Sequence, residues 1–200
     1  FDEHARYSCN ELGVAYYQLE ELDLSEQWLG KAQEKAKNQL RDLKIGDANI
    51  DKKRWIEANL STTMQSLASV MIRRGRYKAA VEVLKEILTH ESDTQVRTTT
   101  SLKLAQAYLI DNDLRDLDTA RTYLNAANGL LKSGDGRNYD QAAIELWYGH
   151  LAYTAGDFEG AKSRYEGAKI MYDNISQTGT LEYESVLRGV KGLAPVFLTP

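Results

Sequence analysis

The sequence predicts an all-helical protein in which about four antiparallel helix pairs stack on one another and a short C-terminal helix closes the stack. Only 2 of the 200 residues are proline, the residue that helix interiors tolerate least. The composition, 42% hydrophobic and 27% charged, is typical of a folded chain with a sizeable core. A template of small and large apolar residues also recurs four times, and this repeat carries the prediction.

Each copy of the template holds two small residues at a set distance. They lie twelve positions apart in three copies: Gly13 and Ser25, Ala68 and Ala80, and Gly149 and Ala161. The remaining copy has Ala105 and Ala120, fifteen positions apart, which predicts an insertion of three residues. Four positions after each second small residue stands a large apolar one: Leu29, Leu84, Leu124 and Tyr165. This agreement predicts a repeated helix–turn–helix unit.

Small residues are needed where two antiparallel helices cross, because bulk at that point would force the axes apart. Large apolar residues one turn away then fill the space on either side. Gly75 and Gly156 occupy matching places in the turns of two copies, where glycine can end a helix in a left-handed conformation. One such hairpin cannot bury its apolar face alone, so neighbouring hairpins are expected to stack.

Helix bounds follow from the template, from capping residues and from runs of turn-forming residues. The largest connection is expected in the stretch 38–50, which contains Gly46-Asp47-Ala48-Asn49, and a second at 133–136, where glycine and aspartate gather. Ser92 or Asp93 is the expected N-cap of the fifth helix, and Asp140 that of the seventh. The expected pairs are 3–43 (helices 3–19 and 22–43), 51–90 (51–74 and 77–90), 94–132 (94–111 and 117–132) and 139–174 (139–155 and 158–174).

One further helix, over 180–192, is expected to pack on the fourth pair and cap the stack. Pro195 prevents this helix from continuing far. The apolar residues 196–198 then either fold back onto the stack or continue into a longer protein, an alternative that the start without Met also leaves open. The whole of 1–200 is thus expected to form a single helical repeat domain.

The first helix carries Cys9, Leu12, Gly13 and Tyr16, and this pattern of a large residue, Leu-Gly and an aromatic resembles the tetratricopeptide repeat family. The other copies match at Met64, Leu67, Ala68 and Met71, at Leu104, Ala105 and Tyr108, and at Tyr148, Gly149 and Ala152. The fourth copy adds the family-like stretch 156–161, Gly-Asp-Phe-Glu-Gly-Ala. The resemblance spans about residues 5–175 and implies a right-handed superhelical stack, a TPR-like α-solenoid.

Two features depart from the family pattern. The closing proline is replaced in every copy, by Lys37, Ser92, Lys132 and Asp173. Successive copies, measured between Leu12, Leu67, Leu104 and Tyr148, lie 55, 37 and 44 residues apart, whereas the family period is about 34. Longer helices or inserted connections are therefore expected, and another all-helical repeat class remains an alternative.

Side chains that could carry chemistry are few and scattered. Cys9 is the only cysteine, which excludes an internal disulfide and a cysteine-based zinc site, and its template position predicts a packing role. The histidines at 4, 90 and 150 lie far apart without metal-ligand spacing, so no metal site and no cofactor are expected. The 111–118 stretch lacks the glycine of a calcium loop and is interpreted as a solvated turn that caps the next helix.

The resemblance to tetratricopeptide repeats implies that the first helix of each pair lines a concave groove in which a partner peptide lies. Asn, Gln and Ser can hydrogen-bond an extended backbone there, and aromatic residues can anchor a side chain. For Trp147, core packing is an equal alternative. The expected groove residues are Asn10, Glu11, Val14, Gln18, Gln65, Ser66, Ser69, Arg73, Lys103, Gln106, Trp147, His150 and Tyr153.

Charge and hydropathy narrow the range of partners. The formal net charge of −4 argues against a general nucleic-acid binder, and no apolar run reaches the roughly eighteen residues that a membrane span needs. The basic cluster at 73–78 is interpreted as a solvated turn, with an acidic partner or phosphate groups as the alternative. A single cysteine fits a reducing compartment, so we expect an intracellular protein, cytoplasmic or nuclear.

Without a catalytic constellation, the sequence predicts a non-catalytic scaffold or adaptor that binds a partner protein or peptide through the repeat groove. One alternative is a structural subunit of a larger multiprotein complex. Another is the regulatory or sensory module of a longer regulator. An enzyme is the least favoured class.

Overall fold

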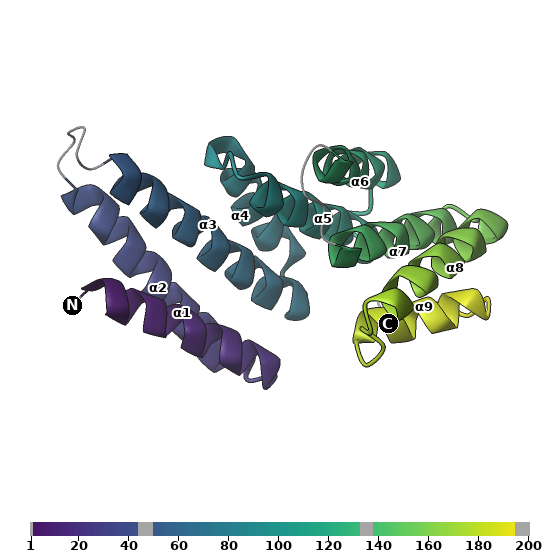
Figure 1. Cartoon of the computed structure of the whole chain (residues 1–200), viewed down its shortest axis with the longest axis horizontal. Helices are drawn as coiled ribbons and strands as arrows, with labels where there is room; N and C mark the ends of the chain where they lie inside the picture. The colour runs from purple at the N-terminus through teal and green to yellow at the C-terminus, as the bar shows by residue number, and fades with distance from the viewer. Residues whose placement is uncertain (1, 44–49, 133–137, 195–200) are drawn as a thin grey trace. The chain divides into compact units, whose positions relative to one another are not determined.

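The computed structural model describes residues 2–43, 50–132 and 138–194, and over these ranges it contains nine helices and no strand (Figure 1). The described part of the chain is therefore all-helical, as predicted. Every helix begins and ends within two residues of its expected bounds. Of the connection expected in 38–50, residues 38–42 belong to a helix and residues 44–49 lie outside the described residues. The expected connection at 133–136 and the apolar segment 196–198 also lie outside them.

The chain divides into two compact units, residues 1–96 and residues 97–200. The N-terminal unit (1–96) holds α1 (Asp2–Gln18), α2 (Leu22–Asp42), α3 (Ile50–Arg73) and α4 (Tyr77–His90). In this unit α1 packs on α2, α2 on α3 and α3 on α4, and α1 also touches α3 (Figure 1). The first helices of two consecutive pairs thus contact each other directly.

The crossing of α1 and α2 has the predicted small residues at its centre. A Cβ atom added to Gly13 would lie 2.5 Å from Cγ of Leu29, which is closer than two non-bonded carbon atoms approach in proteins. The Ser25 hydroxyl, also buried, donates a hydrogen bond of 2.7 Å to the carbonyl of Gly13. The twelve-residue spacing in the sequence therefore marks the point where two helix backbones meet.

The turns between paired helices also follow the prediction. Gly75 and Gly156 have φ of +71° and +82°. In each turn the next amide donates to the carbonyl five residues earlier, at 2.8 Å and 3.0 Å, which is the Schellman arrangement that ends a helix. Glu20 and Ser176 occupy the same left-handed position in two other turns, with φ of 63° and 58°.

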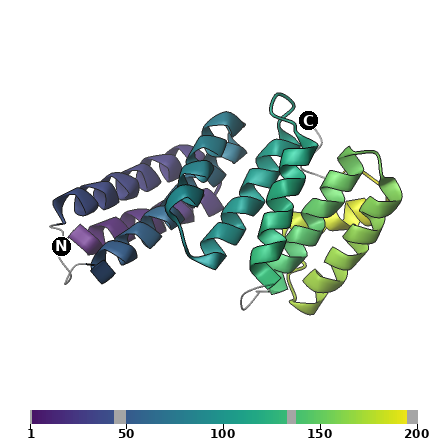
Figure 2. The ribbon, with the colours of Figure 1, turned by 90° about the horizontal axis from the view of Figure 1, so that it is seen from above.

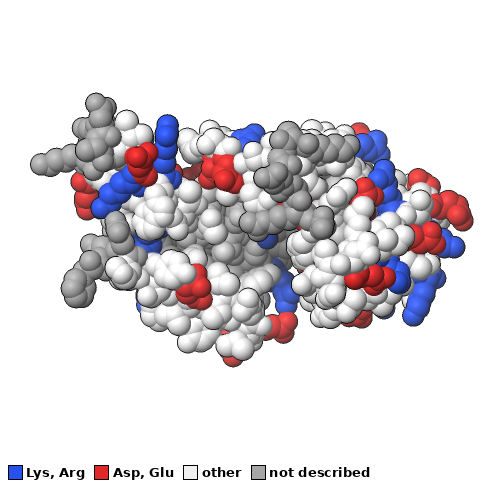
Figure 3. All heavy atoms as spheres, in the orientation of Figure 1, with Lys and Arg blue, Asp and Glu red and all other residues white. Residues whose placement is uncertain are grey.

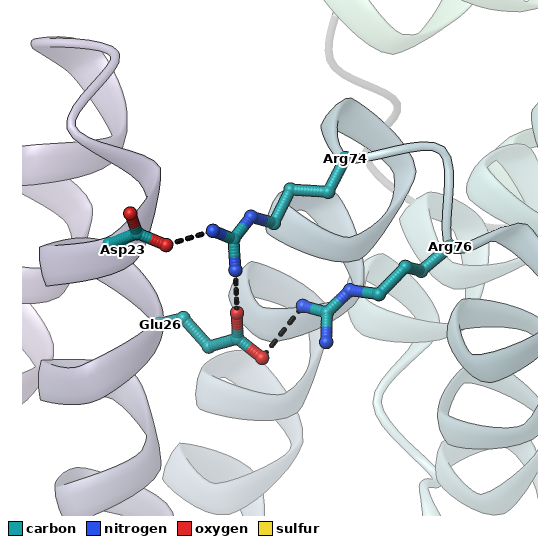
Figure 4. A network of polar contacts seen from close by, with 4 residues as sticks. All are labelled: Asp23, Glu26, Arg74 and Arg76. Carbon is teal, nitrogen blue, oxygen red and sulfur yellow. Dashed lines mark hydrogen bonds and ion pairs between the residues drawn. The ribbon is translucent and has the colours of Figure 1, made fainter.

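A network of charged side chains joins α2 to the turn between α3 and α4 (Figure 4). Arg74 contacts Asp23 and also donates to Glu26 at 2.6 Å. Arg76 donates to the other carboxylate oxygen of Glu26 at 2.7 Å. A separate pair joins Arg73 to a carboxylate at the end of the α1–α2 hairpin, at 2.6 Å. Three arginines of the basic cluster are thus engaged by carboxylates of the same unit.

The C-terminal unit (97–200) holds the greater part of α5 (Thr94–Ile110), together with α6 (Leu117–Lys132), α7 (Asn138–Thr154), α8 (Phe158–Asn174) and α9 (Leu181–Val190). One core cluster is shared by α5, α6 and α7, and a second by α7, α8 and α9. The last helix, α9, packs on both α7 and α8, as expected of a helix that follows the fourth pair. In Figure 2 the colour of these helices runs from teal at α5 through green to yellow at α9.

The Tyr165 ring of α8 packs between two glycines in the C-terminal unit. A Cβ atom on Gly149 of α7 would lie 2.6 Å from the tyrosine ring, and one on Gly189 of α9 would lie 2.3 Å from it. The ring is fully buried. Glycine at both positions is therefore what lets α7 and α9 approach the same large side chain.

Capping residues fix the start of several helices. Asp93 accepts a 2.9 Å hydrogen bond from the amide of Val96 at the start of α5, which confirms the prediction of an N-cap there. Asp116 accepts from the amides of the first turn of α6, and these amides hold the pKa of its carboxyl below the usual value. The 111–118 stretch is thus a capping turn. The expected cap at Asp140 is wrong, because α7 begins at Asn138 and Asp140 is buried inside it.

Candidate functional site

The expected groove residues of the N-terminal unit lie on two helices that touch. On α1 and α3 they are Asn10, Glu11, Val14, Gln18, Gln65, Ser66, Ser69 and Arg73. Thr63 of α3 donates a 3.0 Å hydrogen bond to the amide oxygen of Asn10 on α1. Of the expected set, Asn10 is thereby linked to α3, and Val14 packs against a core cluster that includes Leu67 and Val70 of α3.

Several of these side chains already contact their own chain. The Gln65 amide donates to the carbonyl of Val96 at 2.8 Å, and the Ser69 hydroxyl donates to the carbonyl of Gln65 at 2.9 Å. Glu11 and Gln18 are exposed on α1. These two offer the clearest positions from which a partner could be contacted and the face tested.

The expected groove residues of the C-terminal unit divide into surface and core. Lys103 and Gln106 are half-buried on α5, and Tyr153 is half-buried on α7, where its ring meets that of Phe158 edge-on at 5.3 Å. Trp147 and His150 are 2% and 0% exposed. These two side chains lie in the core of the unit and not at its surface, because α7 is covered by α6, α8 and α9.

His150 is the centre of a buried polar chain. Its Nδ1 lies 2.8 Å from the Tyr165 hydroxyl and its Nε2 lies 3.4 Å from the Ser185 hydroxyl. Burial lowers the pKa of His150 to about 3, so the ring is neutral at physiological pH. Because His150 and Ser185 are fully buried, the pair satisfies polar atoms of the core and is closed to a substrate.

A surface hollow lies in the N-terminal unit at the C-terminal end of α4, and we call it the α4-end hollow. It encloses about 510 Å³. Its lining comes from the end of α2, the N-terminal and central turns of α3, the end of α4 and the three residues that follow: Leu40, Arg54, Glu57, Ala58, Leu60, Ser61, Met64, Glu86, Ile87, His90, Glu91, Ser92 and Asp93.

Unequal helix lengths account for the α4-end hollow. The α3 helix has 24 residues and α4 has 14, so at about 1.5 Å per residue α3 extends roughly 15 Å further. Beyond the end of α4, the first turns of α3 therefore have no α4 beside them. Ile87, Met64 and Ser61 form a buried part of the lining, and Ala58 and Glu57 are exposed.

Acidic side chains predominate in the lining of the hollow. The lining contains four carboxylates (Glu57, Glu86, Glu91 and Asp93) and one guanidinium, that of Arg54, so their formal charges sum to −3. The Glu57 carboxylate also lies 3.6 Å from the ammonium group of Lys53, which is outside the lining. The Glu91 carboxylate accepts from the two amides that follow it, both at 2.8 Å. The segment after α4 is thereby held in a defined conformation.

The α4-end hollow was not predicted from the sequence. The expected groove residues lie on the first helices of the pairs, whereas the hollow is formed mainly by the flank of α3 and the end of a second helix. The unequal spans 51–74 and 77–90 were the available signal, because a long helix paired with a short one leaves a step at the end of the short one.

One face of the C-terminal unit is of mixed charge. Over α8 and α9, Lys and Arg side chains lie among Asp and Glu side chains on the face shown in Figure 3.

Cys9 is buried, which confirms its predicted packing role. None of the helices that the structure describes combines the length and the apolar character needed to cross a membrane.

Comparison of the chain with models of known protein families, and with curated proteins, finds no match.

Proposed function

We propose that the chain is a non-catalytic scaffold of the tetratricopeptide type, which binds a partner protein through the first helices of its repeats. The observation that carries this proposal is the direct contact of α1 with α3 in the N-terminal unit. A contact between the first helices of two consecutive pairs supports a binding surface to which polar side chains of both pairs would contribute. Repeat proteins commonly use such a surface for binding, because each repeat adds to it.

The character of that surface supports the proposal. Glu11 and Gln18 are exposed on α1, and Asn10 is linked to α3 by the hydrogen bond from Thr63. Carboxylate and amide groups at these positions can pair with the backbone or side chains of an extended segment. The two helices are joined by tertiary packing, so little ordering of the scaffold is needed when a partner binds.

A capture experiment with paired charge reversals tests this proposal. Glu11→Arg with Gln18→Arg changes the exposed face of α1, and Glu34→Arg with Gln27→Arg makes the same change of charge on exposed positions of α2. Partners captured from native extract should be lost with the α1 variant and kept with the α2 variant. Equal capture by both variants would contradict binding through the first helices.

A second candidate function is that of a structural subunit in a larger complex. Large apolar side chains of α8 are exposed, Phe158 at 62% and Ile170 at 61%, and surfaces of this kind often mark contacts between proteins. Gel filtration with light scattering on the whole chain, with Ile170→Lys as the comparison, tests this version. A concentration-dependent assembly that Ile170→Lys disperses would support it.

A further inference from the structure

We propose that the α4-end hollow binds a basic segment of a partner protein, with one large apolar side chain seated in the hollow and Lys or Arg side chains beside it. The proposal rests on the proposed function and names the chemistry of a partner. It concerns residues that lie outside the expected groove, so the two can be tested apart.

The volume and floor of the hollow fit an anchoring side chain. About 510 Å³ falls within the roughly 300–1,000 Å³ of pockets that hold small ligands. Met64 and Ile87 are almost completely buried at 4% and 2%, which shows that this part of the lining is apolar and firmly packed. A methionine in such a floor adapts to different side chains.

The charge of the lining selects a cationic segment. Four carboxylates and one guanidinium line the hollow together with its apolar residues, so a Lys or Arg next to the anchoring residue is attracted and an acidic segment is repelled. Among the described residues, no three metal-ligating side chains are grouped to hold an ion.

The segment after α4 makes part of the lining rigid before any partner arrives. The amides of Ser92 and Asp93 donate to Glu91, and Asp93 in turn accepts from the amide of Val96. A surface that is already ordered loses less conformational entropy on binding. This supports a preformed site over one that folds around its ligand.

Selection from a random peptide library displayed on phage, with the whole chain as bait, tests the proposal. Enriched peptides should combine Lys or Arg with a large apolar residue. Replacing their basic residues by Glu should weaken binding at least about tenfold, since the acidic lining then repels them. Replacing the apolar residue by Ser should weaken binding by a similar factor.

Matched variants then locate the site. Ala58→Trp fills the hollow and should weaken binding at least about tenfold, whereas Ala79→Trp, exposed on α4 outside the lining, should not. Glu86→Gln should weaken binding about threefold. Glu82→Gln, one turn earlier on the same helix and outside the lining, should leave it unchanged.

Several outcomes would overturn the proposal: no enriched peptide, enrichment of acidic peptides, or equal binding to Ala58→Trp and Ala79→Trp. Far-ultraviolet circular dichroism on each variant verifies that the helices are retained. If the hollow variants bind normally and Glu11→Arg with Gln18→Arg still abolishes capture of native partners, only the hollow proposal fails. If the hollow variants bind normally and Glu11→Arg with Gln18→Arg also keeps its native partners, the proposed function fails as well.

Discussion

At the scale of single residues, two glycines of the C-terminal unit have opposite surroundings. Gly149 lies against the Tyr165 ring, so a Cβ atom there would meet it at 2.6 Å. Gly167, in the middle of α8, has no such neighbour within 4 Å. The same substitution should therefore act in opposite directions at the two positions.

We expect Gly149→Ala to lower the free energy of unfolding by about 1–3 kcal/mol, because an extra carbon in a packed crossing forces its neighbours apart. Gly167→Ala should raise the free energy of unfolding by about 0.5–1 kcal/mol, because alanine favours the helix. Urea unfolding of both variants, followed by circular dichroism, checks this. Stabilisation by both substitutions would show that the crossing is not tight.

The buried imidazole of His150 gives the folded state a pH dependence. Burial lowers its pKa from 6.5 to about 3. Between these two pH values His150 is therefore protonated in the unfolded chain and neutral in the folded chain. This contribution to stability is fully present above about pH 6.5 and is lost as the pH falls toward about 3, by at most about 1.4 kcal/mol per pH unit.

Unfolding of the wild type and of His150→Gln at pH 7 and pH 5 measures this contribution. We expect the loss of stability between the two values to be about 1–2 kcal/mol smaller in the variant. The readout is the difference between two pH values, so it is independent of how much the substitution itself destabilises the fold. Equal losses in both proteins would contradict the assignment.

At the scale of elements, the α2 helix is tied to the α3–α4 turn by charge. Glu26 contacts both Arg74 and Arg76, and its side chain is 28% exposed. Because these groups are partly exposed, we expect Glu26→Gln to lower the free energy of unfolding by only about 0.5–1.5 kcal/mol, and by less at high salt.

Arg121 provides the control for this network. Its guanidinium nitrogen lies 3.9 Å from a carboxylate oxygen of Asp118, and both side chains are largely exposed. Arg121→Gln should therefore change the free energy of unfolding by less than about 0.5 kcal/mol. Thermal unfolding at low and high salt compares the two variants. A Glu26→Gln effect that is independent of salt would indicate a packing role and not an electrostatic one.

The helix bounds could be predicted from the sequence because their causes are local. Gly75 and Gly156 end helices through their own backbone conformation, and Gly13 and Ser25 mark a crossing between neighbours in the chain. The burial of His150 was not predicted and that of Trp147 was only one of two alternatives, because α7 is covered on several sides and therefore has no single apolar stripe. The cap at 140 failed because the helix starts two residues earlier.

The α4-end hollow was also beyond the sequence analysis, although its cause is simple. It forms where three helices come together, at Leu40 of α2, Ala58 of α3 and Ile87 of α4. A residue pattern within one helix does not predict such a contact among three. The lengths of α3 and α4 contain the information only once the two are known to pack together.

At the scale of the whole molecule, the proposed binding surfaces for a partner lie mainly in one of the two compact units. The N-terminal unit carries the adjoining faces of α1 and α3 and the α4-end hollow. In the C-terminal unit, the ring of His150 is enclosed in the core and α8 displays exposed apolar side chains. Binding is therefore expected to depend most strongly on substitutions in the N-terminal unit.

The most direct test of the central claim is the affinity of a captured native partner for the whole chain, measured by isothermal titration with the two charge-reversal variants. We predict that Glu11→Arg with Gln18→Arg weakens binding at least about tenfold. Glu34→Arg with Gln27→Arg should leave the affinity within about twofold of the wild type. Equal affinities for the two variants would contradict a scaffold that binds through its first helices.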